Sequence, residues 1–318
     1  MRIHLITPSP SPSRGGNWTT AARWARILRG LGHRVRVART YRGEAADLMV
    51  ALHAWRSADS IAGFADRHPS RPLVVALTGT DAYRFIHSHP EPTLRSLELA
   101  DRLVGLHDRI GDVLPPEQIG KLRVIFQSAP PGLPRDPYRR GFRVCVAGHL
   151  REEKDPLRPA LALRGLPTAS RLRVDHYGGA HSPDWADAAR AEMAANPRYR
   201  WHGEVPHHRL RRVFARSQLL VLPSRMEGGA NVISEAVMAG LPVIASRIAG
   251  SVGLLGDDYP GYYPVADTGA LRALLLRAES DKQFLQMLER ACAACRPRFE
   301  PRREHRAWEA LLRDIGCY

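Results

Sequence analysis

Residues 219–236 read LLVLPSRMEGGANVISEA, and this stretch decides the fold class. Its first four residues are apolar and have the length of a buried strand. A polar loop with two adjacent glycines comes next, and from Val232 the apolar residues recur at helical spacing. A buried strand that runs through a glycine-containing loop into a helix is the repeating unit of a parallel sheet covered by helices on both faces.

The same succession of short apolar strands and helices occurs throughout the chain. We expect strands at 2–7, 34–38, 47–52, 73–77, 102–106 and 122–126, and again at 142–147, 172–177, 199–201, 219–222 and 242–245. Residues 130–141 combine proline, glycine and arginine without periodicity, which is typical of a linker. We therefore predict an α/β chain with two doubly wound Rossmann-like domains, 1–129 and 142–300, that face each other across a cleft. A last helix within 301–318 is expected to pack back on the first domain.

Composition and charge indicate a soluble cytoplasmic protein with small anionic substrates. The 318 residues include 47 Lys and Arg against 32 Asp and Glu, a formal charge of +15. No stretch approaches the roughly 18 uninterrupted apolar residues of a membrane span, and the first apolar run is too short for a signal peptide. The positive charge is spread over both halves without a basic tail, which argues against a nucleic-acid-binding arm. A compositional preference for arginine explains the charge equally well.

The four cysteines do not suggest a disulfide framework. Cys292 and Cys295 have C-x-x-C spacing, but without a second such pair we read them as structural residues rather than as zinc ligands or a redox pair. No D-x-D cluster of the kind that binds metal is present, since Asp257 and Asp258 are adjacent and are expected in a turn. We expect no metal and no cofactor.

Two glutamates frame the loop after the strand at 219–222. Glu227 lies at the mouth of the loop and Glu235 one turn inside the helix, so both carboxylates can address one ligand. Carboxylates recognise sugar hydroxyls, and the backbone N–H groups at a helix start recognise phosphate. The alternative is a solvated helix start with a capping glutamate. Lys154, with Arg151, comes after the strand at 142–147 and precedes a helix expected from Pro156, so these cations would either offset a leaving diphosphate or be surface charges.

In the first domain, polar residues come after two neighbouring strands and are expected at the same edge of the sheet. His53 ends the strand at 47–52; it is a candidate proton carrier, or it bonds a backbone carbonyl. Thr80, Asp81 and Arg84 come after the strand at 73–77 and are candidates to hold an acceptor, with Asp81 alternatively capping the next helix. The remaining candidates are residues at a helix start, suited to anion binding or to close packing, and one at the end of the strand at 122–126: Gly15, Gly16, Asn17 and Gln127.

The stretch 224–236 resembles the E-x7-E element of the family 4 glycosyltransferases, which have the GT-B fold. Residues 239–245 match the segment that comes directly after that element in the family, Gly15-Gly16 matches the glycine loop, and residues 148–154, GHLREEK, match the G-R-L-x-x-x-K element. The resemblance implies that Glu227 holds donor-sugar hydroxyls, Glu235 the ribose and Lys154 the diphosphate. Two positions depart from the family: His149 replaces an arginine, and Gly229-Ala230 replaces Phe-Gly. The donor-binding set implied is His149, Arg151, Lys154, Arg225, Glu227, Gly228, Gly229, Ala230, Asn231 and Glu235.

Shorter motifs at 16–18, 52–60, 77–81, 125–128, 224–230 and 246–250 resemble the selenosugar synthases of selenoneine biosynthesis. This resemblance implies transfer of a sugar, typically from UDP-N-acetylglucosamine, to selenophosphate, with release of UDP and phosphate. His53, Glu227 and Lys154 are then the candidate catalytic residues. The acceptor-binding set expected is Gly15, Gly16, Asn17, His53, Thr80, Asp81, Arg84 and Gln127.

Three other functions remain open. The first is a glycosyltransferase with a lipid, polysaccharide or thiol acceptor, and the second is an RNA-binding protein that uses the positive charge. A dinucleotide-dependent oxidoreductase is disfavoured because no G-x-G-x-x-G comes after a strand. We expect small-molecule substrates, no nucleic acid and no stable membrane association; the oligomeric state is not predicted.

Overall fold

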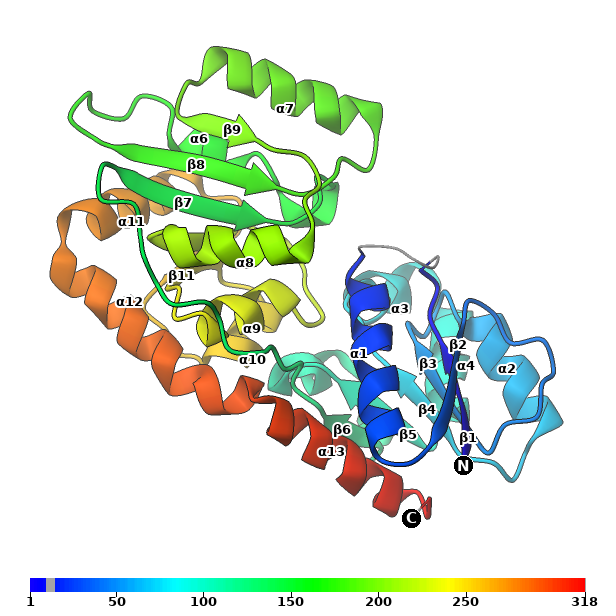
Figure 1. The fold of residues 1–318 in the computed structure, drawn as a ribbon. Helices are drawn as coiled ribbons and strands as arrows, with labels where there is room; N and C mark the ends of the chain where they lie inside the picture. Colours follow the sequence, from blue (N-terminus) through cyan, green and yellow to red (C-terminus); the bar gives the residue numbers. More distant parts are fainter. Residues whose placement is uncertain (10–14, 318) are drawn as a thin grey trace. The chain divides into compact units, whose positions relative to one another are not determined.

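Two parallel six-stranded sheets form the centres of two units in the computed structural model, which describes residues 1–9 and 15–317 (Figure 1). The first unit contains Met1–Gln127 and the chain from Pro301 onwards, and the second contains Ser128–Glu300. Residues 130–141 form no helix or strand. No helix of the described ranges is both long and apolar enough to cross a membrane.

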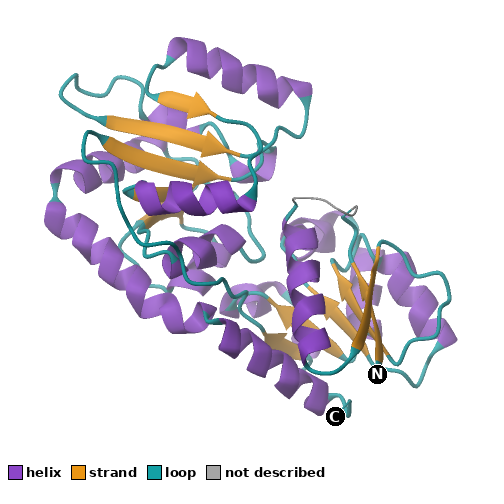
Figure 2. Cartoon of the chain, in the orientation of Figure 1, coloured by secondary structure: helices purple, strands orange, loops and turns teal. Residues whose placement is uncertain are grey.

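The sheet of the first unit has the order β2-β1-β3-β4-β5-β6. Its strands are β1 (Arg2–Ile6), β2 (Arg34–Ala38), β3 (Leu48–Leu52), β4 (Leu73–Ala76), β5 (Arg102–Gly105) and β6 (Leu122–Val124). Its helices are α1 (Gly16–Gly30), α2 (Ala58–Arg67), α3 (Ile86–Ser88), α4 (Pro90–Leu99), α5 (Pro116–Ile119) and α13 (Pro301–Asp314). The central strands β3 and β4 are buried throughout, because helices cover both faces of the sheet (Figure 2).

Helices α1 and α13 cover one face of this sheet, and α2 and α4 cover the other. Alternate residues of each strand belong to the two cores, as the two-residue period of a strand requires. Trp308 of α13 packs edge to face on Trp24 of α1, with ring centroids 4.8 Å apart. The indole of Trp24 donates to the buried carboxylate of Glu304, 2.8 Å away. The last helix is therefore part of the core of the first unit.

The sheet of the second unit has the order β12-β11-β10-β7-β8-β9. Its strands are β7 (Phe142–Ala147), β8 (Leu172–Tyr177), β9 (Tyr199–Trp201), β10 (Leu219–Leu222), β11 (Val243–Ser246) and β12 (Tyr262–Tyr263). Its helices are α6 (Arg158–Ala162), α7 (Pro183–Ala195), α8 (His207–Arg216), α9 (Asn231–Met238), α10 (Ala249–Leu255), α11 (Thr268–Ser280) and α12 (Lys282–Cys295). Because β7 and β10 are neighbours, the loops after them leave the same edge of the sheet.

The expected α/β class with two Rossmann-like sheets is confirmed, and five strands, β2 and β7 to β10, have the predicted bounds. The prediction of a helix from Pro156 was wrong. Residues Glu152–Lys154 form a 3-10 turn, and Asp155 takes a left-handed conformation with φ of 42°. Asp155 therefore separates this turn from the next helix, and α6 begins at Arg158, two residues later than predicted.

Candidate active site

The loops after β7 and β10 bring two predicted donor-site residues into contact. Lys154 Nζ lies 2.5 Å from Glu227 Oε1, although 73 positions separate the two residues. The hydroxyl of Ser224 donates to the same oxygen at 2.6 Å. The side chain of Lys154 is 19% exposed and that of Glu227 is 8% exposed, so the pair sits at the edge of the protein interior. One ammonium and one carboxylate are thus held side by side within reach of a ligand.

The loop of Glu227 is fixed by close contacts that the sequence alone did not predict. The hydroxyl of Ser246, at the end of β11, donates to the carbonyl of Ser224 at 2.5 Å. Gly250, the second residue of α10, packs so tightly that a Cβ there would lie 2.3 Å from the carbonyl oxygen of Glu227. Both residues lie within the motif at 246–250, but their partners are more than twenty positions away in the chain. Ser246 and Gly250 therefore fix the backbone of the loop that carries Glu227.

The loop after β7 is anchored from β8. His176 is completely buried, and its Nε2 donates to the carbonyl of Gly148 at 3.0 Å while its Nδ1 accepts from the hydroxyl of Tyr199 at 3.1 Å. Gly178 has φ of 153°, and a Cβ there would lie 2.0 Å from the oxygen of Gly148. His149 accepts the backbone N–H of Gly179 at its Nδ1, 3.2 Å away. These contacts set the path of the loop that leads to Lys154.

Burial of His176 makes the second unit sensitive to acid. Burial lowers the pKa of His176 from 6.5 to about 4, against the opposing effect of its hydrogen bond to the carbonyl of Gly148 and with smaller contributions from His202 and His149. Between these values the unfolded chain binds a proton that the folded chain excludes, so the stabilisation is complete above pH 6.5 and is lost as the pH falls towards 4. We expect this group to cost about 2 kcal/mol of the free energy of unfolding between about pH 7 and about pH 5. Urea titrations of the wild type and of His176→Gln at several pH values measure this loss of stability. The same pH dependence in both chains would contradict the assignment of the loss to His176.

Helix α9 begins at Asn231, directly after the glycine-containing loop. Glu235, one turn inside, has its Oε1 3.2 Å from Nε2 of His207 on α8, a partner that the sequence alone did not suggest. The hydrogen bond from Glu235 raises the pKa of His207. Glu235 and His207 line a small cavity together with Phe214. The side chain of Glu235 is 18% exposed, and its carboxylate is paired with the imidazole of His207.

The other predicted donor-site residues lie on the same two loops. Arg225 is exposed, and its backbone N–H donates to the carbonyl of Glu153 at 2.8 Å, which ties the two loops together. Arg151 has its Nε 3.8 Å from the carboxylate of Glu153. Residues Gly228, Gly229 and Ala230 form the turn that leads into α9.

The cysteines take no part in these loops. Cys145, Cys292 and Cys295 are buried, and the sulfur of Cys292 lies 3.2 Å from the hydroxyl of Tyr259. Burial raises the pKa of Cys292 to about 11, which disfavours the thiolate that metal binding and redox chemistry require. Within residues 1–9 and 15–317, no group of three or more His, Cys, Asp or Glu residues is placed to hold a metal ion.

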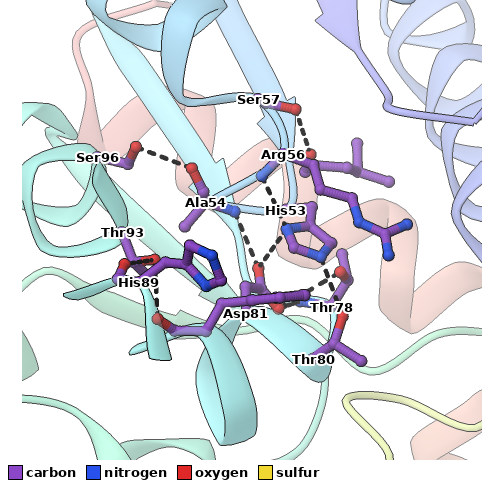
Figure 3. A network of polar contacts seen from close by, with 12 residues as sticks. His53, Ala54, Arg56, Ser57, Thr78, Thr80, Asp81, His89, Thr93 and Ser96 are labelled. Atoms are coloured by element: carbon purple, nitrogen blue, oxygen red, sulfur yellow. Dashed lines mark hydrogen bonds and ion pairs between the residues drawn. The ribbon is translucent and has the colours of Figure 1, made fainter. Parts of the chain in front are cut away.

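In the first unit, His53 joins the polar groups at the ends of β3 and β4 (Figure 3). The ring is 1% exposed; its Nε2 lies 3.0 Å from Thr80 Oγ1, and its Nδ1 accepts the backbone N–H of Arg56 at 3.2 Å. The predicted alternative of a bond to a backbone carbonyl was wrong, because the backbone partner is an N–H group. His53 has φ of 73°, in the left-handed region that histidine, like asparagine and aspartate, enters more often than most residues other than glycine. Burial lowers the pKa of His53, against the opposing effect of Asp81.

Asp81 holds the two strand ends together. Its side chain is completely buried; Oδ2 accepts the backbone N–H of Ala54 at 2.9 Å, and Oδ1 accepts that of Thr78 at 2.8 Å. It does not cap the next helical segment, so that predicted alternative was wrong. Oδ2 of Asp81 also lies 3.9 Å from Nδ1 of His53, while Arg84 is exposed.

The remaining predicted residues lie around the start of α1. Gly15 precedes the helix, which begins with Gly16 and Asn17. A Cβ on Gly16 would meet no described atom within 4 Å, so close packing does not require glycine there. Gln127 donates to the hydroxyl of Thr20 at 2.5 Å, and that hydroxyl donates to the carbonyl of Gly16. These hydrogen bonds connect the segment after β6 to the start of α1.

Part of the chain is similar in sequence to known glycosyltransferases. Residues 137–292 match the family model of glycosyl transferases group 1. D-inositol 3-phosphate glycosyltransferase 1 of Catenulispora acidiphila is 29% identical over 159 residues, which is 45% of this chain and 37% of that protein. The chain thus spans little more than a third of this curated relative.

Solved structures show the fold over the whole chain. HepE of Anabaena, determined with UDP and glucose, has a TM-score of 0.78 at 15% identity and covers 99% of this chain and 100% of its own. Sucrose-phosphate synthase of Thermosynechococcus elongatus has a TM-score of 0.75 at 16% identity and covers 99% of both chains. The GT-B fold class is therefore confirmed.

Proposed function

We propose that this chain is a UDP-sugar-dependent glycosyltransferase, a proposal that the match of residues 137–292 to the model of the glycosyl transferases group 1 family supports. The observation that carries the proposal is the contact of Lys154 with Glu227, at adjacent strand ends and just before the start of α9. A nucleotide sugar presents hydroxyls and a diphosphate, and this place offers a carboxylate, an ammonium group and helix-start amides.

In the proposed reaction, the second unit binds the donor. Glu227 accepts hydrogen bonds from hydroxyls of the transferred sugar, and Glu235 accepts those of the ribose. Lys154 and the amides at the start of α9 offset the charge that develops on the diphosphate as the glycosidic bond breaks. The ion pair with Glu227 keeps the ammonium of Lys154 in place before the donor arrives, so little reorganisation is needed at that moment.

We propose further that the donor is UDP-N-acetylglucosamine and the acceptor selenophosphate. The motifs at 52–60, 77–81 and 224–230 support this assignment, and the net charge of +15 suits two anionic substrates. Selenium attacks the anomeric carbon, the carbon–oxygen bond to UDP breaks, and UDP leaves with the bonding electrons. Water then cleaves the phosphorus–selenium bond, which gives the selenosugar and phosphate. The selenium nucleophile needs no general base, so positioning supplies most of the rate.

Incubation of the protein with selenophosphate and a panel of UDP-sugars tests this reaction. A selenium-containing hexosamine detected by mass spectrometry, together with UDP, is the expected result. UDP release only with lipid or oligosaccharide acceptors, accompanied by sedimentation with anionic vesicles, would refute selenophosphate and leave a transferase of another acceptor class.

Replacing Glu235 with alanine should weaken UDP binding about 10- to 100-fold, because the ribose hydroxyls lose a charged acceptor. Calorimetry on the full chain measures the change. Glu289→Ala, which removes an exposed carboxylate from α12, is the matched control and should bind UDP as the wild type does. Equal UDP affinity in the Glu235→Ala chain would place the ribose elsewhere.

A further inference from the structure

Two hydroxyl groups in the first unit each lie against a buried histidine. Thr80 Oγ1 is 3.0 Å from Nε2 of His53, and the hydroxyl of Tyr83 is 3.0 Å from Nε2 of His107. His53 comes after β3, His107 after β5, and the segment of Thr80 and Tyr83 after β4, which lies between them in the sheet. Three neighbouring parallel strands therefore bring these four residues to the edge where ligands bind in such sheets. The contact between His107 and Tyr83 was not predicted from the sequence.

The backbone decides which ring nitrogen of each histidine carries the proton. Nδ1 of His53 accepts the N–H of Arg56, and Nδ1 of His107 accepts the N–H of Arg109, both at 3.2 Å. In a neutral imidazole whose Nδ1 accepts, the proton is on Nε2. Both rings are buried, with exposures of 1% and 0%, and burial lowers the pKa of His107 to about 4. Each histidine therefore donates to its hydroxyl.

A hydroxyl that accepts from a histidine keeps its own hydrogen to donate. The described residues offer no acceptor for the hydrogen of Thr80 or of Tyr83, since each hydroxyl makes only its contact with histidine. Burial, with Asp112 and Asp81, raises the pKa of Tyr83, so its phenol stays protonated. The hydroxyls of Thr80 and Tyr83, three positions apart in the chain, can therefore each donate a hydrogen bond to a ligand.

The charges around the two hydroxyls favour an anion. The guanidinium groups of Arg56 and Arg84 are exposed, and each lies 5.9 Å from the ring centroid of Phe85, two positions after Tyr83. Asp81, the carboxylate nearest in sequence, is completely buried and accepts two backbone N–H groups. Asp112, which also acts on Tyr83 and His107, lies 4.0 Å from the guanidinium of Arg109, which offsets its charge. The surface therefore presents donors and positive charge.

We propose that Thr80 and Tyr83 form a hydroxyl clamp for the oxygens of a phosphate-type oxyanion, with His53 and His107 as positioning residues that aim the two hydroxyl protons. That this oxyanion is the acceptor of sugar transfer rests on the proposed function. His53 is then not a proton carrier, because its Nδ1 accepts from the backbone and its Nε2–H is used by Thr80.

Inorganic phosphate is the probe, and calorimetry on the full chain is the measurement. Thr80→Val and Tyr83→Phe keep the shape of each side chain and should each weaken phosphate binding about 10-fold or more, whereas Thr80→Ser should stay within about threefold of the wild type. Thr168→Val and Tyr138→Phe are matched controls that should bind phosphate normally, because both residues are exposed in the second unit. Wild-type affinity in both Thr80→Val and Tyr83→Phe would overturn the clamp.

The positioning role has its own test. His53→Asn and His107→Asn leave an acceptor near the backbone N–H groups of Arg56 and Arg109 but cannot reach the hydroxyls, and asparagine tolerates the positive φ at position 53. Both variants should weaken phosphate binding several-fold and raise the KM of the acceptor while kcat changes less. Nitrogen-15 spectra of labelled histidine should show Nε2 protonated and Nδ1 unprotonated in both rings. Nδ1 protonation in either ring would overturn the proposal.

UDP affinity separates this proposal from the proposed function. A chain that binds phosphate through Thr80 and Tyr83 but does not bind UDP supports the clamp and refutes the transferase. A chain that binds UDP and transfers sugar at the wild-type rate in Thr80→Val and Tyr83→Phe supports the transferase and refutes the clamp.

Discussion

Replacing Lys154 with methionine is expected to slow sugar transfer about 100- to 1,000-fold, since the departing diphosphate loses the cation placed to offset its charge. The change also leaves the carboxylate of Glu227, only 8% exposed, without its ionic partner, so we expect a loss of about 1 to 3 kcal/mol in the free energy of unfolding. UDP release measures the first effect, and urea titration measures the second. Lys282→Met, at an exposed position of α12, is the control and should change neither.

A double variant separates chemistry from stability. Lys154→Met combined with Glu227→Gln removes both charges, and Ser224 can still donate to the amide oxygen. We expect this chain to regain most of the lost stability and none of the lost activity. Recovery of activity with stability would show that Lys154 only supports the fold, and would contradict its assignment to the diphosphate.

Gly250→Ala should be strongly destabilising although alanine is the better helix former. Its Cβ would lie 2.3 Å from the carbonyl oxygen of Glu227, so α10 or the loop must move, at a cost of about 1 to 3 kcal/mol in the free energy of unfolding. Because the loop carries Glu227, we also expect transfer to fall at least about 10-fold.

The same substitution at Gly63 supplies the comparison. Gly63 lies within α2 with an exposed surface, and a Cβ there meets only the ring of Tyr41 at an ordinary 3.9 Å. Gly63→Ala should therefore raise the free energy of unfolding by about 0.5 to 1 kcal/mol. Thermal or urea unfolding of both variants checks the opposite signs, and stabilisation by Gly250→Ala would refute the close approach.

The strands could be predicted from sequence because a parallel strand buried on both faces is a continuous apolar run ended by glycine, proline or polar residues. Lys154 and Glu227 were both predicted as donor-site residues, but their direct contact was not predicted. It depends on β7 lying beside β10, and strand order is not written in any local pattern.

Residues that contact a backbone group far away in the chain were not predicted. His176 and Gly178 both contact the carbonyl of Gly148, and no residue near either of them in the sequence indicates this contact. The left-handed conformation of Asp155, directly before the predicted start of α6, is likewise not predicted by its neighbours in the chain. Tyr83 and His107 stand 24 positions apart without a motif, and only the sheet unites them.

The packing of α13 on α1 has a consequence for biosynthesis. The first unit is built mainly from residues 1–127, yet Trp308 and Glu304, which complete the surroundings of Trp24, are translated only after the whole of the second unit. Chains are made at about 5 to 20 residues per second, and their domains ordinarily fold in the order of synthesis. The second unit can therefore fold first, while the first unit still lacks α13 and the face of α1 that carries Trp24 is uncovered. A released chain that ends at Glu300 should therefore have a protease-sensitive amino-terminal part and a protected second unit.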